Sequence, residues 1–204
     1  MIRRRRAAWA RLAGPLVAVG VLAAGCGGGG SSSPFAGAFH APSGYAAYHG
    51  SGYIVAMPAG YVAKRGTLSD QPPGSTVIEA TRGGSAAAKT QSEILLLENP
   101  HLTMSLDQVV SNLTEADRTN TSVSNAQLSA TKTTVPGAHD ARIVTESYVA
   151  PDSPTNPTAT RFERKWLMVL IKPGLLLDVV VANAPKLGGN IDADAVIDSF
   201  RLEQ

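Results

Sequence analysis

Alternating hydrophobic and polar residues predict a series of β-strands that begins near residue 52. The first three strands are expected at Gly52–Met57, Val77–Thr81 and Ser92–Leu97. Turn-forming residues separate them, because Pro58-Ala59-Gly60 follows the first strand and Gly83-Gly84 precedes the third. The third strand is almost continuously apolar, so we expect both of its faces to be buried.

The hydrophobic period changes from two to about 3.6 after residue 104. Ser105-Leu106-Asp107-Gln108 has the spacing of a capping box, in which a serine at the N-cap is followed three residues later by glutamine. Leu106, Val109, Val110 and Leu113 then recur at helical spacing. The pattern predicts an amphipathic helix over residues 106–118 with one apolar face.

Four further strands are expected after this helix, at Gln127–Val135, Asp140–Val149, Arg161–Ile171 and Leu175–Ala182. In the second of them, alternation places Ala141, Ile143 and Thr145 on one face and Arg142, Val144 and Glu146 on the other. The last two strands are densely branched and are joined by Lys172-Pro173-Gly174, which predicts a central hairpin.

A second helix is expected after Asn190-Ile191-Asp192, because Val196, Ile197 and Phe200 follow at helical spacing. The predicted order is three strands, a helix, four strands and a helix. We therefore expect an α+β fold, with a mostly antiparallel sheet of about seven strands and two helices packed on it.

Several of these segments together resemble the PsbP-like α/β sandwich. They are residues 53–61 (YIVAMPAGY), the helix that begins at Ser105, the turn at residues 134–137 (TVPG) and the closing residues 197–202 (IDSFRL). Tyr61 stands where members of the family often carry tryptophan. The fold occurs in the extrinsic photosystem II protein PsbP, in a nuclear Ran-binding protein and in actinobacterial lipoproteins of the LpqN type. The resemblance covers most of residues 50–203 and implies a domain that binds protein partners.

The first 25 residues have the parts of a secretory signal peptide. Four arginines at residues 3–6 precede an uncharged apolar run from Leu12 to Ala24, which is too short to span a bilayer. An uncleaved membrane anchor is the alternative. Ala23-Ala24-Gly25-Cys26 resembles a bacterial lipobox, although leucine is favoured where Ala23 stands. Because Cys26 is the only cysteine, an exported protein would leave it unpaired unless a thioether bond to a lipid consumed it.

Three segments follow from this interpretation: residues 1–25 are the signal peptide, residues 26–50 a lipidated tether, and residues 51–204 one PsbP-like domain. The tether is rich in glycine, serine and proline, and as a coil it would reach roughly 25 to 30 Å. Cys26 is the predicted lipid attachment site, with the palmitate-type acylation of bacterial lipoproteins. The protein is expected on the extracytoplasmic face of the cell membrane, and its Ala, Gly and Thr content suits an actinobacterial genome.

Removal of the signal peptide changes the charge of the protein. The full chain carries a net charge of +2, with 18 basic and 16 acidic residues. Residues 1–25 contain five of the basic residues and no acidic one, so 13 basic and 16 acidic residues remain, a net charge of −3. We therefore expect no nucleic-acid partner.

Candidate chemistry in the domain is sparse. His40, His49, His101 and His139 lack the spacing of metal ligands. Ser129-Ala130-Thr131-Lys132 matches the Ser-x-x-Lys motif of penicillin-interacting enzymes, but it lies in a predicted strand and lacks the partner motifs. Asn190-x-Asp192-x-Asp194 resembles the opening of a calcium loop, yet carboxylates there also suit a helix start. Trp166 is expected in the core rather than as a ligand platform.

These observations favour a binding or scaffolding module over an enzyme, with no catalytic residue, cofactor or metal. The expected partners are the membrane, through the lipid anchor, and another protein of the cell envelope. The alternative is a carrier that holds a lipid or another small hydrophobic ligand, which would need an apolar cavity. The sequence leaves the oligomeric state and the export route open.

Overall fold

The computed structural model describes residues 33–67, 72–85, 91–151 and 159–203. Within these residues the chain forms ten β-strands, two α-helices and one short 3-10 helix. The strands make two sheets in which every pairing is antiparallel, one of seven strands and one of three. The structure therefore has the expected α+β class with a mostly antiparallel sheet.

The larger sheet has the strand order β3-β4-β5-β9-β8-β7-β6. Its strands are β3 (Tyr61–Arg65), β4 (Thr76–Arg82), β5 (Ser92–Asn99), β6 (Ser124–Thr133), β7 (Asp140–Pro151), β8 (Ala159–Lys172) and β9 (Leu175–Asn183). The predicted central hairpin is confirmed, since β8 and β9 pair with each other inside the sheet. Seven strands were expected and seven form this sheet, but β3 was not among those predicted.

The smaller sheet has the order β1-β2-β10, and only its central strand was predicted. Its strands are β1 (Tyr45–His49), β2 (Tyr53–Pro58) and β10 (Arg201–Leu202). β10 joins the end of the chain to β2 near its beginning, with Arg201 opposite Ile54. This pairing closes the fold on itself, so the two ends of the domain stabilise each other.

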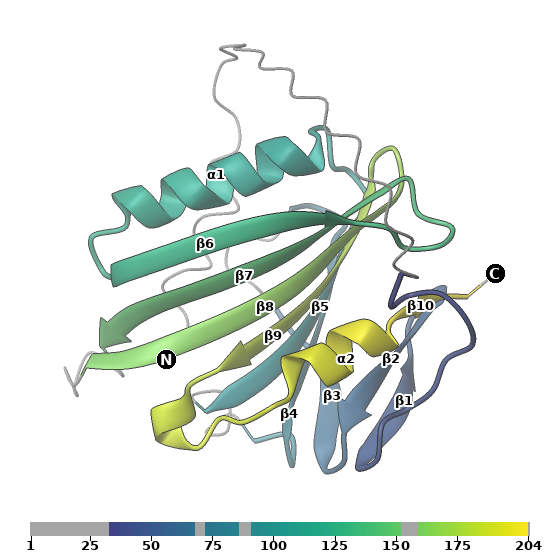
Figure 1. Ribbon diagram of the computed structural model, residues 1–204, viewed down its shortest axis with the longest axis horizontal. Helices are drawn as coiled ribbons and strands as arrows, with labels where there is room; N and C mark the ends of the chain where they lie inside the picture. Colours follow the sequence, from purple (N-terminus) through teal and green to yellow (C-terminus); the bar gives the residue numbers. More distant parts are fainter. Residues whose placement is uncertain (1–32, 68–71, 86–90, 152–158, 204) are drawn as a thin grey trace.

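Helix α1 (Leu106–Thr119) covers one face of the larger sheet (Figure 1). The predicted capping box is present: the Ser105 hydroxyl accepts a hydrogen bond from the Gln108 N–H, and the Gln108 side chain accepts one from the Ser105 N–H. Leu106, Val109 and Leu113 are buried against the sheet. The amphipathic pattern thus places the helix with its apolar face inward.

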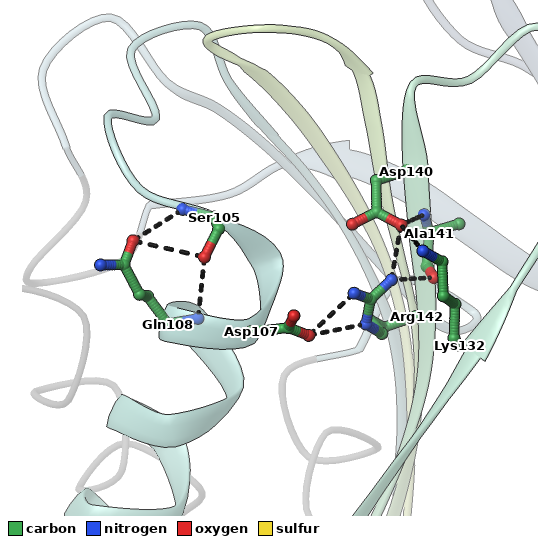
Figure 2. A network of polar contacts seen from close by, with 7 residues as sticks. All are labelled: Ser105, Asp107, Gln108, Lys132, Asp140, Ala141 and Arg142. Carbon is green, nitrogen blue, oxygen red and sulfur yellow. Dashed lines mark hydrogen bonds and ion pairs between the residues drawn. The ribbon is translucent and has the colours of Figure 1, made fainter. Parts of the chain in front are cut away.

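An ion-pair network fixes the start of α1 to strand β7 (Figure 2). The buried Arg142 guanidinium donates two hydrogen bonds to Asp107 in the first turn of the helix, at 3.0 and 2.8 Å. It donates another to Asp140 at 2.5 Å. Burial alone would raise the pKa of Asp140, but the hydrogen bond and charge of Arg142 outweigh it and hold that pKa below its usual value.

The opposite face of the larger sheet is covered by the small sheet and by helix α2 (Ala193–Ser199), which follows the 3-10 helix η3 (Pro185–Leu187) (Figure 1). The Asp192 carboxylate caps α2 by accepting a hydrogen bond from the Ala195 N–H. Val196, Ile197 and Phe200 are fully buried, as their spacing predicted. This layer holds the larger of the two main apolar clusters.

The folded structure begins earlier than the expected tether allows. Phe35 is 1 % exposed and belongs to the main core, and the Ser33 hydroxyl donates a hydrogen bond to the Thr134 carbonyl. β1 also lies inside the segment 26–50. Because small and polar residues dominate this segment, its composition predicted a tether, although it also contains a few large residues that pack in the fold. The predicted signal peptide and the predicted lipid attachment site, Cys26, lie outside the described residues. Within the described part no helix is long and apolar enough to cross a membrane.

Candidate functional site

A polar groove lies on the α2 side of the larger sheet, where β6, β7 and β8 extend beyond that helix. Its volume is about 450 Å³. Its floor consists mainly of two transverse rows of side chains, each with one residue from each of four neighbouring strands. Since residues i and i+2 of a strand share a face, the rows are two positions apart on every strand.

The first row runs from Ser129 through Thr145 and Lys165 to Val181. The Ser129 and Thr145 hydroxyls are 2.7 Å apart and form a hydrogen bond across β6 and β7. Lys165 forms an ion pair with Asp194 of α2, which joins the floor of the groove to the helix beside it. This row presents hydroxyl groups on β6 and β7 and a neutralised charge pair on β8, and it ends at the buried Val181.

The second row runs from Gln127 through Ser147 and Glu163 to Asn183. Glu163 accepts a hydrogen bond from the Arg161 Nε at 3.1 Å, and both side chains are at least half exposed. The Asn183 amide is committed to the fold: it donates to the Ile191 carbonyl at 2.8 Å and accepts from the Ile191 N–H at 3.0 Å. Asn183 thereby holds the connection that leads into α2.

A partly buried ion pair lies on the opposite face of the same strands, behind the floor of the groove. Arg164 Nη1 lies 3.5 Å from the Glu146 carboxylate, and both side chains are largely buried. The Arg164 guanidinium also lies over the ring of Tyr148, 5.3 Å from its centroid, within the range of a cation–π interaction. Tyr148 in turn stacks on Phe162. These contacts occupy the face of β7 and β8 that lies behind the groove.

The groove offers hydroxyls, amides and paired charges of both signs. Such a surface can exchange its water-mediated contacts for hydrogen bonds to a polar partner. Its charged side chains are paired with each other, so the groove has no strong field of one sign. It favours a ligand or protein surface with mixed donors and acceptors over a highly charged one.

Apart from Asp194, which pairs with Lys165 in the floor of the groove, the sequence candidates lie away from this groove with one exception. His49 pairs with Glu203 at the edge of the small sheet, 2.8 Å away, while His40, His101 and His139 lie elsewhere on loops and turns. Within the described residues, no three metal-ligating side chains come together. Trp166 is 4 % exposed and belongs to the cluster beneath α1, which confirms its place in the core.

The Ser-x-x-Lys match is the exception, since Ser129 belongs to the groove. It lies in strand β6, as predicted, and its hydroxyl is bound to Thr145. Lys132 projects from the other face of that strand and lies 4.0 Å from Asp140. The serine and the lysine therefore do not converge. Asp192 and Asp194 also diverge, one as the helix cap and the other as the partner of Lys165.

Sequence reasoning did not identify the groove. The alternating pattern of residues 161–165 places Arg161, Glu163 and Lys165 on one face of β8. What the pattern could not show is that α2 stops short of them and that β6 and β7 add hydroxyls beside them. Only the strand register brings these residues together.

No protein-family model matches the chain, and no curated protein matches it. What the groove can bind therefore follows from its own residues.

Proposed function

We propose that this protein is a lipid-anchored binding module of the cell envelope, which docks a partner protein through the polar groove beside α2. The observation that supports the proposal is the pair of polar rows on the sheet, which α2 leaves uncovered. Because α2 does not cover these side chains, their polar groups are available for hydrogen bonds to a partner. The module is proposed as a binder and not as an enzyme.

The anchor in this proposal is Cys26. The lipobox-like residues before it, the basic and apolar leader and the absence of a second cysteine in the sequence support lipidation at this position. Two acyl chains suffice for stable attachment to a bilayer. The domain would then face away from the cytoplasm, where the proposed partner is another envelope protein.

We also propose kinship with the PsbP-like proteins, and in particular with the LpqN-type lipoproteins. The antiparallel sheet with one helix on each face supports this proposal. The segments that carry the resemblance fall on β2, on α1 and its cap, on the turn before β7, and on α2 with β10.

The alternative proposal of a hydrophobic carrier requires an apolar cavity. Leu128, Val181 and Ala193 contribute apolar atoms to the groove, but its lining also includes Ser129, Thr145 and Glu163, so it is not an apolar cavity. A lipid chain would gain little from such a surface, because the polar groups would lose their water without new hydrogen bonds. The groove thus favours a polar partner over an apolar one.

The docking proposal can be tested with a photo-crosslinking amino acid in cells. Placed at Ser147 in the groove, the probe should yield a defined crosslinked species. The matched control is the same probe at Ser111, which is exposed on α1, on the opposite side of the sheet. Addition of Arg161→Glu, which puts two acidic groups side by side at Glu163, should reduce the crosslink from Ser147. Equal crosslinking from both positions would contradict docking through the groove.

The anchor requires its own test. Cys26→Ala should release the protein from membranes after an alkaline wash, while the unaltered protein stays in the membrane fraction. Persistence of the variant in that fraction would overturn the lipoprotein proposal and favour an uncleaved N-terminal anchor.

A further inference from the structure

Strand β6 forms an open edge of the larger sheet, and its sequence carries few of the features that normally protect an edge. It has ten residues, no proline and a single charged side chain, Lys132. The other edge strand, β3, has five residues and ends in Lys64 and Arg65. Short length and charged side chains are common means of preventing edge-to-edge pairing. β6 is thus the edge that is better suited to pairing.

The edge is accessible. Eight of the ten β6 residues are exposed, and Leu128 and Thr133 are half-buried. A register shift between Ser124 and Gln127, with Asn125 at a positive φ of 51°, disturbs the beginning of the strand. A regular run from Gln127 to Thr133 remains, which is long enough to form a ladder with another strand.

The pattern of hydrogen bonds identifies the backbone groups that point away from the sheet. In an antiparallel ladder, successive residues face their two neighbouring strands in turn. The Ala184 N–H, at the end of β9, donates to the Gln91 carbonyl at 2.7 Å. The backbone N–H and C=O groups of the even-numbered residues of β9 therefore point toward β5, and those of the odd-numbered residues point toward β8. The same alternation can be followed across the sheet, from Val181 to Lys165 on β8, to Thr145 on β7 and to Ser129 on β6. It shows that the backbone N–H and C=O groups of Leu128, Ala130 and Lys132 point away from β7, toward the open side of β6.

We propose that β6 pairs edge to edge with β6 of a second copy of this chain, antiparallel, about a two-fold axis at Ala130. Ala130 then lies opposite Ala130 of the second copy, where the small side chains leave room for close approach. Leu128 lies opposite Lys132 of the second copy, so the lysine side chains of the two copies do not lie opposite each other. On the groove side, Ser129 lies opposite Thr131, a pair of hydroxyl residues that favours cross-strand contact.

The strand is therefore complementary to itself in size, charge and polarity in this one register. Antiparallel pairing about a two-fold axis perpendicular to the sheet keeps the same face on the same side in both copies. The two grooves then lie on one side of a continuous fourteen-stranded sheet. The proposal is independent of what the groove binds.

Disulfide trapping tests both the pairing and its register. The full-length chain with Cys26→Ser, kept in mild detergent, has no other cysteine. Ala130→Cys should form a disulfide between copies, because hydrogen-bonded cross-strand residues have Cα atoms about 5.5 Å apart. Leu128→Cys alone should form no such disulfide, because residue 128 of the second copy lies four positions along the strand, about 13 Å away. A mixture of Leu128→Cys and Lys132→Cys should form a heterodimer.

Light scattering of the same chain provides a second measurement without cysteines. The protein should become dimeric as its concentration rises from micromolar to near-millimolar. Ala130→Asp places two carboxylates opposite each other and should keep the protein monomeric, whereas Ala130→Thr should leave the dimer intact. Ala130 is exposed, so neither variant disturbs a packed core. A monomer at every concentration, a dimer that survives Ala130→Asp, or equal trapping at positions 128 and 130 would overturn the proposal.

Discussion

At the residue scale, the carboxyl group of Asp178 is the least expected feature of the core. It lies in β9, the central strand of the larger sheet, on the face that α1 covers. Leu97 lies opposite it on β5 and Met168 opposite it on β8. The residue is 2 % exposed, and its Oδ1 has no hydrogen-bond partner among the described residues. Burial disfavours the charged form and raises the pKa of Asp178 to about 8.

This pKa makes the stability of the protein depend on pH. Between about pH 4 and pH 8 the unfolded chain releases the Asp178 proton while the folded protein keeps it. The free energy of unfolding should therefore fall as the pH rises through this range, by up to about 1.4 kcal/mol for each pH unit. Asp178→Asn removes this contribution, so the variant should become more stable relative to the unaltered protein as the pH increases.

Urea denaturation of both proteins from pH 4 to pH 8 measures this difference. Ser111→Ala is the control, because it alters an exposed position on α1 and removes no titratable group. A stability difference between Asp178→Asn and the unaltered protein that stays constant with pH would show that the carboxyl is ionised in the folded state.

At the scale of elements, α1 is held at its beginning by two separate devices, the capping box and the Arg142 ion pairs. Ser105→Ala removes the side-chain acceptor for the Gln108 N–H and should lower the free energy of unfolding by about 1 kcal/mol. Ser111→Ala, on the exposed face of the same helix, is the matched control and should change stability little. Thermal unfolding followed by circular dichroism would measure both effects; equal values would mean that the cap contributes nothing.

The elements that could be predicted from the sequence are those whose pattern is long enough to stand out. Helix α1 was predicted to within one residue because its capping box and its apolar spacing agree. Strands β1, β3 and β10 were not predicted, because they have five residues or fewer and are half-exposed or exposed. Such strands are specified by their neighbours: β10 is a strand because β2 lies beside it.

The candidate site could not be predicted for a related reason. Ser129, Thr145 and Lys165 are each ordinary residues of an alternating strand. They become neighbours only through a register that three strands set together. The position of α2, which decides whether they are covered, depends in turn on the packing of Val196, Ile197 and Phe200.

At the scale of the whole molecule, the N-terminal boundary of the domain is tied to its core. Phe35 packs in the cluster that joins the small sheet, α2 and the larger sheet. Phe35→Ala should therefore lower the free energy of unfolding by about 3 to 5 kcal/mol, as expected for a large aromatic side chain in a core. His40→Ala, at an exposed position five residues later, should have little effect in the same denaturation experiment. Two similar values would place Phe35 outside the cooperative fold.

The hydrogen bond between Ser33 and Thr134 also limits how far the domain can stand from a bilayer. Only residues 27–32 separate it from Cys26, and six residues span at most about 20 Å even when fully extended. A protein lipidated at Cys26 would thus keep its domain close to the bilayer, with the turn between β6 and β7 nearest the headgroups. A partner that reaches it must come down to the surface of the membrane or be embedded in it.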